Sequence, residues 1–244
     1  MDREVARQLA SELASEAVVV DVGGGSRPFP RANYIIDAIP YAVPPTEVDP
    51  VIGAARYTEQ TWAQVDICRR EPWPFPDKFF DFAVCTQTLE DIRDPVWVCS
   101  ELNRIAKAGY VETPSRILEQ TMGIENPYFA GYYHHRWLVS AGDKGIEFRH
   151  KPHFLHAWPN TIVSKLGLNQ ALNPKYENFQ FRWKDRLEAT EVLEFSEDKL
   201  IEDLASFART ARGLPDLLVP AHGTLQSRIK RAIYFARVRR SSPK

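Results

Sequence analysis

The stretch Val18-Val19-Val20-Asp21-Val22-Gly23-Gly24-Gly25-Ser26 decides the fold of this chain. β-branched residues favour extended backbone, and a continuous apolar run predicts a strand that is buried on both faces. The three glycines that follow allow a tight turn and let a ligand come close to the main chain. The stretch therefore predicts a buried strand over residues 17–22 whose end faces a bound molecule.

Further apolar runs predict the remaining strands of the same sheet. They cover residues 34–37, 63–67, 81–85 and 110–112. Two helices alternate with these strands, one over 2–16 and one that begins at Asp94-Pro95 and ends at Gly109. Such alternation predicts an α/β fold with a Rossmann-like, doubly wound and mostly parallel sheet.

The second half of the chain has a different pattern. Residues 136–139 and 146–150 flank a polar turn and predict a hairpin, and a helix is expected to run from Ser196 to Gly213. We expect two domains, a Rossmann-like domain over 1–165, with an aromatic-rich acceptor region, and a helical C-terminal extension over 166–244. The last segment carries an apolar stripe amid basic residues, formed by Leu225, Ile229, Ala232, Ile233 and Ala236.

The charge, the cysteine count and the hydropathy of the chain argue against some classes of partner and location. The chain has 244 residues and a formal net charge of -1, so no nucleic-acid partner is expected. Its three cysteines form no CxxC pair, which favours reduced thiols and a cytoplasmic location. No run approaches the roughly 20 apolar residues of a membrane span, so stable membrane insertion is not expected.

Polar residues follow four of the predicted strands. They are Asp21 with Gly23, Gly24 and Gly25, then Asp37, then Asp66 beside Ile67, then Thr86 in Thr86-Gln87-Thr88. Ligands of open α/β sheets bind at the carboxyl ends of the strands, where a carboxylate can accept both hydroxyls of a ribose. A dinucleotide fold would need a third glycine where Pro28 stands, so the ligand is expected to lack a pyrophosphate.

Two further motifs give the chain a family resemblance. Val18–Ser26 and the segment Trp73-Pro74-Phe75-Pro76-Asp77-Lys78-Phe79-Phe80-Asp81-Phe82-Ala83-Val84-Cys85 resemble the first and the strand-four motifs of class I S-adenosylmethionine-dependent methyltransferases. Leu89-Glu90-Asp91-Ile92, Asp94-Pro95 and Glu101–Ile105 resemble the helix that follows in that family, in its type 11-like members. The similarity covers roughly residues 15–115.

The resemblance implies S-adenosylmethionine as the cofactor and assigns roles to the first two site segments. Asp21, Gly23 and Gly25 would contact the amino-acid part of the cofactor. Asp37 would hold the ribose.

The later site segments receive roles in the same way. Asp66 and Ile67 would bind the adenine, and Thr86 would lie near the methionine side. The sequence departs from the family at Arg27, where another glycine is usual, and at Asp91, where a histidine is frequent.

The expected reaction is methyl transfer to a small-molecule, sugar or lipid-linked glycan acceptor. A hydroxyl acceptor would need a base, and the foremost candidates are His134, His135 and Asp91, with Glu90 and Glu112 as further ones. Adjacent histidines on a strand would face opposite ways, so only one of the two would point into the site. The alternative is a non-catalytic binding or partner protein with the methyltransferase fold.

No metal site is expected. His150, His153 and His156 step by three, but Pro152 opposes the helix that would bring them together.

Overall fold

The computed structural model describes residue 1, residues 3–25, 27–41, 49–158, 160–163 and 170–220, and the single positions 225, 229 and 233. By its contacts the chain divides into two compact units. Unit 1 comprises Met1–Thr113, Val139–Phe148 and Gln180–Glu191, and unit 2 comprises Pro114–Leu138, Arg149–Phe179 and Val192–Lys244. Each unit is thus built from three separate stretches of sequence.

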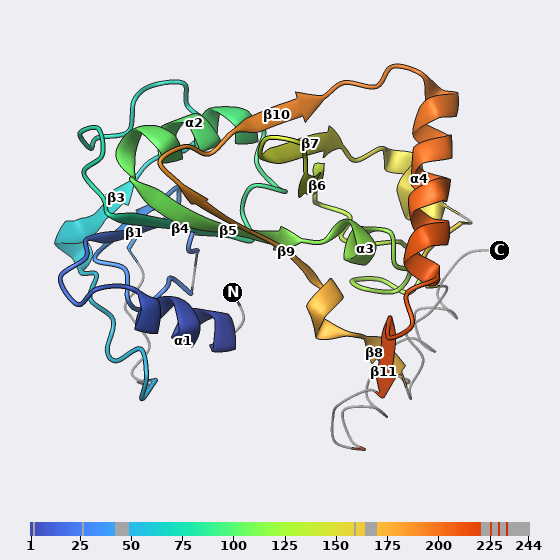
Figure 1. The fold of residues 1–244 in the computed structure, drawn as a ribbon, viewed down its shortest axis with the longest axis horizontal. Helices are drawn as coiled ribbons and strands as arrows, with labels where there is room; N and C mark the ends of the chain where they lie inside the picture. The colour runs from blue at the N-terminus through green and yellow to red at the C-terminus, as the bar shows by residue number, and fades with distance from the viewer. Residues whose placement is uncertain are drawn as a thin grey trace. The chain divides into compact units, whose positions relative to one another are not determined.

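The central feature is a six-stranded sheet in the order β3-β2-β1-β4-β5-β9 (Figure 1). Its strands are β1 (Val19–Val22), β2 (Tyr34–Asp37), β3 (Trp62–Gln64), β4 (Phe82–Thr86), β5 (Ala108–Pro114) and β9 (Asn178–Lys184). The first five run parallel, and Val20 pairs with Tyr34 on one side and Ala83 on the other. All four residues of β1 are buried, as the apolar run predicts. The prediction of a mostly parallel Rossmann-like sheet is confirmed.

Helices α1 (Arg3–Glu12) and α2 (Pro95–Ile105) lie on opposite sides of this sheet in Figure 1. Asp94 caps α2 as predicted, because its side chain accepts a hydrogen bond from the Trp97 N–H at 3.1 Å. Such a cap contributes about 1 kcal/mol to helix stability. Helix α1 packs Ala6 and Leu9 into a core that includes β-strand residues of the sheet. Helices therefore cover both faces, as a doubly wound sheet requires.

One local prediction fails at the end of α2, and one about the segment after β1 is met. Helix α2 ends at the Ala106 cap, and Gly109 lies inside β5 rather than after the helix. A Cβ at Gly109 would lie 2.5 Å from the carbonyl oxygen of Ala83, so this glycine serves the close approach of β5 to β4. In the described part of residues 23–33, which joins β1 to β2, the chain forms no helix, and Pro28 lies in this connection.

The remaining elements include the predicted hairpin. They are α3 (Arg116–Glu119), β6 (Trp137–Ala141), β7 (Ile146–His150), β8 (Gln170–Leu172), β10 (Ala189–Val192), α4 (Glu197–Arg212) and β11 (Leu218–Pro220), with short 3₁₀ helices at Glu59–Thr61, His153–Ala157 and Pro174–Tyr176. Strands β6 and β7 are neighbours, as expected, and β10 completes a three-stranded sheet. Ser196 caps α4 by accepting from the Lys199 N–H at 3.3 Å.

Residues 166–244 differ from the helical extension that the sequence predicts. They contain α4 but also β8, β9, β10 and β11, and β9 joins the central sheet. The physical reason is visible at Trp183, a buried residue of β9 whose ring packs close to Gly109 of β5. The apolar positions Ala232 and Ala236 lie outside the described residues.

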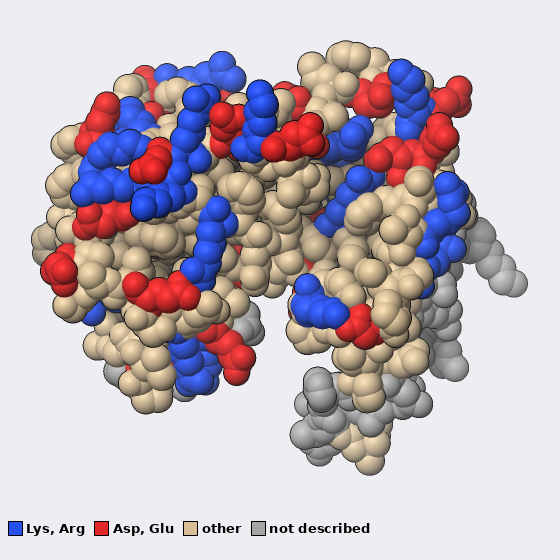
Figure 2. Space-filling model, in the orientation of Figure 1, with Lys and Arg blue, Asp and Glu red and all other residues tan. Residues whose placement is uncertain are grey.

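The charged side chains visible in Figure 2 are of both signs. Lys and Arg are interspersed with Asp and Glu over the face seen in Figure 2. Among the described residues, no helix combines the length and the apolar character needed to cross a membrane.

Candidate functional site

The glycine turn after β1 is the first part of the candidate site, and it lies in unit 1. Gly23 and Gly25 have φ angles of +76° and +57°, which favour glycine. The Gly23 N–H donates to the carbonyl oxygen of Ile36 at 2.9 Å, so the turn stays attached to β2. A Cβ at Gly24 would lie 2.7 Å from Asp21 Oδ2, whereas a Cβ at Gly25 would meet nothing within 4 Å. The turn is therefore packed on its inner side and open at Gly25.

Asp21 is buried at the start of this turn. Its Oδ2 accepts the Phe29 N–H at 2.7 Å, while its Oδ1 is buried with no hydrogen-bond partner among the described residues. Burial raises the pKa of Asp21 to about 7, and nearby Asp37 adds to the rise, although the hydrogen bond from Phe29 opposes it. A buried carboxylate oxygen without a donor is costly, so this atom is suited to receive one from a ligand.

Asp37 is the last residue of β2 and holds the glycine turn from the other side. Its Oδ2 accepts the Gly25 N–H at 2.8 Å, and its Oδ1 accepts the Ile39 N–H at 3.0 Å. Each carboxylate oxygen has a second lone pair that could accept a ligand hydroxyl. The residue expected to hold a ribose thus also shapes the turn that would contact the rest of the ligand.

Asp66 lies just beyond β3 and is exposed. Its Oδ2 accepts from Arg93 at 2.8 Å, and its Oδ1 accepts the Cys68 N–H at 3.0 Å. The hydrogen bond from Arg93 lowers the pKa of Asp66. Ile67 beside it is buried and offers its carbonyl oxygen to Trp73 Nε1 at 3.3 Å. Arg93 was missed in the sequence because the pair is 27 residues apart and no local pattern joins them.

Thr86 ends β4, and the two residues after it tie this strand to the glycine turn. Thr88 Oγ1 lies 3.0 Å from the carbonyl oxygens of both Gly23 and Thr86 and can donate to either. Gln87 has a φ of +53°, a strained value for a residue with a side chain. The sequence predicts Thr86 as the site residue of the segment Thr86-Gln87-Thr88. The side chain that contacts the glycine turn is that of Thr88.

These residues fit an adenosyl amino acid. The bare Oδ1 of Asp21 suits an ammonium group, Asp37 has lone pairs for a diol, and the main chain at Gly25 opens to free space. Charge-assisted hydrogen bonds to a carboxylate are stronger than neutral ones. The fit is clearest at Asp21 and Asp37 and less direct at Asp66, whose oxygens already have partners.

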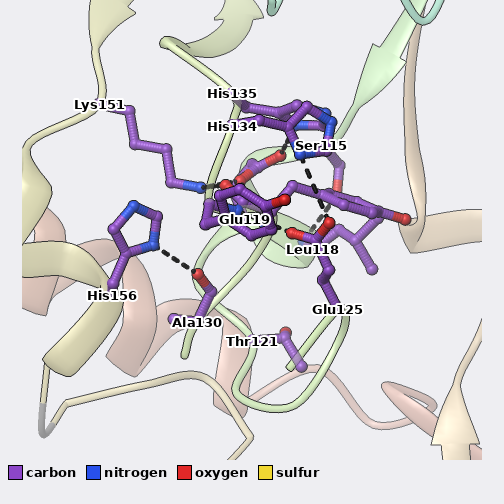
Figure 3. A network of polar contacts seen from close by, with 12 residues as sticks. Ser115, Leu118, Glu119, Thr121, Glu125, Ala130, His134, His135, Lys151 and His156 are labelled. Atoms are coloured by element: carbon purple, nitrogen blue, oxygen red, sulfur yellow. Dashed lines mark hydrogen bonds and ion pairs between the residues drawn. The ribbon is translucent and has the colours of Figure 1, made fainter. Parts of the chain in front are cut away.

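A second polar site lies in unit 2, centred on the buried carboxylate of Glu119 at the end of α3 (Figure 3). His135 Nδ1 lies 2.5 Å from Glu119 Oε1, and the ammonium of Lys151 contacts Oε2. Lys151 also donates to the carbonyl oxygen of Tyr132 at 2.6 Å, while the Tyr132 N–H donates to Glu119 Oε2 at 3.3 Å. All three ionisable side chains are buried.

The electrostatics of this cluster favour an ionised Glu119. Burial alone would raise the pKa of Glu119, but the hydrogen bond from His135 and the charge of Lys151 outweigh burial and lower it. An ionised carboxylate accepts only, so the proton of a neutral His135 belongs on Nδ1. The basic nitrogen of His135 is then Nε2.

His134 stands beside this cluster and is exposed. Its Nδ1 lies 3.5 Å from Glu125 Oε1, and the two histidine rings have centroids 4.4 Å apart. The prediction that the two histidines face opposite ways is wrong, because they lie in a turn before β6 and not on a strand. Glu119 and Lys151 were missed in the sequence, being 32 residues apart.

Asp91 lies in the loop after β4, where its N–H donates to the carbonyl oxygen of Thr88 at 3.1 Å. It belongs to unit 1, whereas His134 and His135 belong to unit 2.

Several solved structures are similar to this chain. One is an S-adenosylmethionine-dependent methyltransferase from Thermotoga maritima, with 22% identity and a TM-score of 0.31, over 46% of this chain and 51% of that chain. Another, from Mesorhizobium loti, has 14% identity and a TM-score of 0.32, over 62% and 64% of the two chains. The N-terminal domain of EvdMO1 with S-adenosylhomocysteine bound has 12% identity and a TM-score of 0.33, over 84% and 69%.

The chain thus spans about half the length of the Thermotoga structure. No curated protein matches the sequence. A family model described as a methyltransferase domain matches residues 1–143, which is more than half of the 244 residues. The chain therefore belongs to the methyltransferase domain family, in agreement with its resemblance to class I S-adenosylmethionine-dependent methyltransferases.

Proposed function

We propose that this chain transfers a methyl group from S-adenosylmethionine to a small-molecule, sugar or lipid-linked glycan acceptor in the cytoplasm. The observation that carries the proposal is the buried, unpartnered Oδ1 of Asp21 beside a glycine turn that is open at Gly25. Family membership supports methyl transfer in general, and the free thiols Cys68, Cys85 and Cys99 favour a reducing compartment.

The residues of unit 1 would hold the cofactor. Asp21 would accept from its ammonium group, Asp37 would accept from the ribose, and the main chain of Gly23, Gly24 and Gly25 would line its amino-acid part. When bound, S-adenosylmethionine supplies a methyl group already activated by a sulfonium charge. The main contribution of the protein is then alignment of the two reactants.

Adenine and methionine contacts complete the proposed site. Ile67 would pack on the adenine, and Asp66 would accept from its amine while keeping its bond to Arg93, since each carboxylate oxygen has two lone pairs. Thr86 would line the methionine side.

We further propose that His135 removes the proton of the acceptor. A neutral hydroxyl is a poor nucleophile, and a nearby imidazole can take its proton as the new bond forms. Glu119 supports this role because its Oε1 lies 2.5 Å from His135 Nδ1, which favours the tautomer whose unprotonated nitrogen is Nε2. A base arranged in this way favours a hydroxyl acceptor over an amine or a thiol. His134 and Asp91 are the other candidates; His134 is exposed, and its Nδ1 lies 3.5 Å from Glu125 Oε1.

The direct test of cofactor binding is calorimetric titration with S-adenosylhomocysteine, with NAD as the control ligand. We expect micromolar binding of the first ligand only, and at least about a tenfold loss of affinity in Asp37→Ala. Val51→Ala, at an exposed site in unit 1, is the matched control and should bind normally. Absence of binding by the wild-type protein would overturn the proposal and favour a non-catalytic role.

The acceptor class is tested separately by mass spectrometry of products from a panel of sugars, nucleotide sugars and amines. We expect O-methyl products whose formation falls at least about a hundredfold in His135→Gln, with S-adenosylhomocysteine binding unchanged. Methylation on nitrogen that is insensitive to His135→Gln would contradict the role of His135 without affecting the cofactor site.

A further inference from the structure

Lys151 is a buried cation of unit 2 that contacts both ends of the histidine turn, residues 132–136. Its side chain has no exposed surface, and its ammonium contacts Glu119 Oε2, as Figure 3 shows. The same ammonium donates to the carbonyl oxygen of Tyr132 at 2.6 Å. The Lys151 N–H donates to the carbonyl oxygen of Arg136 at 2.7 Å. Lys151 therefore joins the first and the last residue of the turn to the carboxylate of Glu119.

The histidine turn packs directly on Glu119. Gly131, just before the turn, has a φ of +61°, and a Cβ there would come within 2.5 Å of the Glu119 carbonyl oxygen. The Tyr132 N–H donates to Glu119 Oε2 at 3.3 Å, and His135 Nδ1 lies 2.5 Å from Oε1. The rings of Tyr132 and His135 have centroids 4.5 Å apart. The orientation of the imidazole is thus set by Glu119 and by the packing of the turn.

The charges of these side chains determine how readily His135 takes up a proton. A buried carboxylate beside an imidazole favours the imidazolium, because the ion pair has no net charge. With Lys151 present, the ammonium and the carboxylate already balance each other. A further proton on His135 would leave a net positive charge in a buried site, which is costly. The balance therefore favours a neutral imidazole, which is the form that accepts a proton.

The ionisable neighbours of His135 in the histidine turn leave this balance in place. His134 and Arg136 flank it, and both are exposed, where charges contribute little. Glu125 Oε1 lies 3.5 Å from His134 Nδ1, so this carboxylate is placed beside the exposed histidine.

His156 is the ionisable neighbour on the side of Lys151 (Figure 3). Burial lowers the pKa of His156, and the charge of Lys151 lowers it further, although the contact of its Nδ1 with the carbonyl oxygen of Ala130 opposes the change. His156 is therefore neutral at neutral pH and adds no second cation. The charge that faces Glu119 here is that of Lys151.

We propose that Lys151 is a positioning residue for the base: it balances the charge of Glu119 and so keeps His135 neutral and oriented for proton transfer. This inference rests on the proposed function, which assigns the base role to His135. Lys151 does not touch the reactants and acts through Glu119 and the histidine turn. Its contribution is electrostatic as well as structural, and the two can be separated.

The test is a titration of the histidine rings of the full chain by nitrogen-15 NMR, which needs neither cofactor nor acceptor. His135→Gln assigns the signals of His135 among the six histidines. We expect Lys151→Met to raise the pH at which His135 Nε2 takes up a proton by at least about one unit, a tenfold change in proton affinity. An unchanged titration would overturn the proposal.

Two controls assign the shift to this particular charge. Lys175→Met removes an exposed ammonium that contacts Asp216 in the same unit, and it should leave the titration of His135 unchanged. The shift caused by Lys151→Met should persist in an Asp91→Asn background, where that candidate base has no charge. Disappearance of the shift in this background would assign it to Asp91 and contradict the proposal.

A second comparison serves if Lys151→Met does not fold, which near-ultraviolet circular dichroism would show. Glu119→Gln and the double variant Lys151→Met with Glu119→Gln both lack the carboxylate and differ in the ammonium alone. We expect His135 to take up its proton at least about one pH unit lower in Glu119→Gln, because the unbalanced cation repels the imidazolium. Equal titrations of the two variants would overturn the proposal in the same way.

The pH dependence of methyl transfer is the functional readout. The acid limb of the kcat profile should move to higher pH in Lys151→Met by the same amount as the NMR titration, with KM unchanged. A lower kcat with an unshifted profile would mean that Lys151 has a structural role only. Absence of methyl transfer by the wild-type protein would contradict the proposed function, whereas the NMR titration would still decide the role of Lys151.

Discussion

The Gly25 N–H donates to Asp37 Oδ2 at 2.8 Å, which joins the glycine turn after β1 to the carboxyl end of β2. The glycine turn and the end of β2, which the sequence predicts as two separate parts of the site, are therefore held together by a hydrogen bond. Asp37 holds the turn in place and also has lone pairs that can accept from a ligand. Substitution of either Gly25 or Asp37 should therefore weaken ligand binding.

Gly25→Ala tests the open side of this turn. The new Cβ would enter space that the cofactor is proposed to occupy, so we expect at least about a tenfold weaker binding of S-adenosylhomocysteine. The left-handed φ of +57° should also reduce the free energy of unfolding by about 1–2 kcal/mol. Urea denaturation and calorimetry measure the two effects. Gly53→Ala is the control, because Gly53 also has a positive φ with open space around it. It should lose similar stability and bind normally.

Asp21→Asn should be more stable than the wild type at neutral pH. The native pKa of about 7 lies above the ordinary value of 3.8, so the native state holds the Asp21 proton more tightly than the unfolded chain does. Wild-type stability should therefore fall as pH rises from about 4 to 7, by up to about 1.4 kcal/mol per pH unit, and level off above 7.

The asparagine variant lacks this ionisation. The difference between its free energy of unfolding and that of the wild type should therefore be absent below pH 4 and constant above pH 7. Urea denaturation at a series of pH values measures the difference between the two curves. The same substitution should abolish binding of S-adenosylhomocysteine. A variant with the pH dependence of the wild type would show that Asp21 is not the group responsible.

Lys151→Met should destabilise unit 2 strongly. It removes the ammonium that contacts Glu119 and leaves a buried carboxylate with less compensation, at an expected cost of about 3–5 kcal/mol in the free energy of unfolding. The double variant Lys151→Met with Glu119→Gln removes both charges and should recover a substantial part of that loss. Additive effects of the two substitutions in a double-mutant cycle would mean that the side chains do not interact.

Cys85 and Cys99 should be unreactive in the native protein. Both thiols are buried, and burial raises the pKa of each, which depletes the thiolate that reacts. We expect labelling by a disulfide reagent at least about a hundredfold slower than that of a free thiol, with rapid labelling once urea unfolds the chain. Fast reaction of either residue without denaturant would point to opening of the α2 side of the sheet.

The sequence predicts the parts of the fold that depend on short stretches. Strand β2 has the expected bounds, because its apolar run and its terminal acid are adjacent, and Asp94 with Pro95 starts α2 by purely local hydrogen bonding. The cofactor candidates Asp21 and Asp37 follow from strand ends in the same way. Local signals of this kind survive folding because the residues that interact are neighbours in the chain.

The parts that fail depend on distant residues. The local sequence predicts Gly109 as a helix end, whereas the structure has it in β5, close to the backbone of β4. The sequence does not predict β9 in the central sheet, because its partner strand lies far away in sequence. The Glu119–Lys151 pair shows the same limit, since each member alone resembles an ordinary surface charge. The local sequence around each residue does not predict that both side chains are buried.

The division of unit 1 into three stretches has a consequence for synthesis of the protein. Its last stretch, Gln180–Glu191, supplies most of β9, which borders β5 in the central sheet. While the ribosome is still making residues 144–191, β5 has a row of unpaired backbone groups that could pair with another strand. Unit 1 therefore completes its sheet only after most of the chain has emerged, and a fragment limited to residues 1–143 should aggregate.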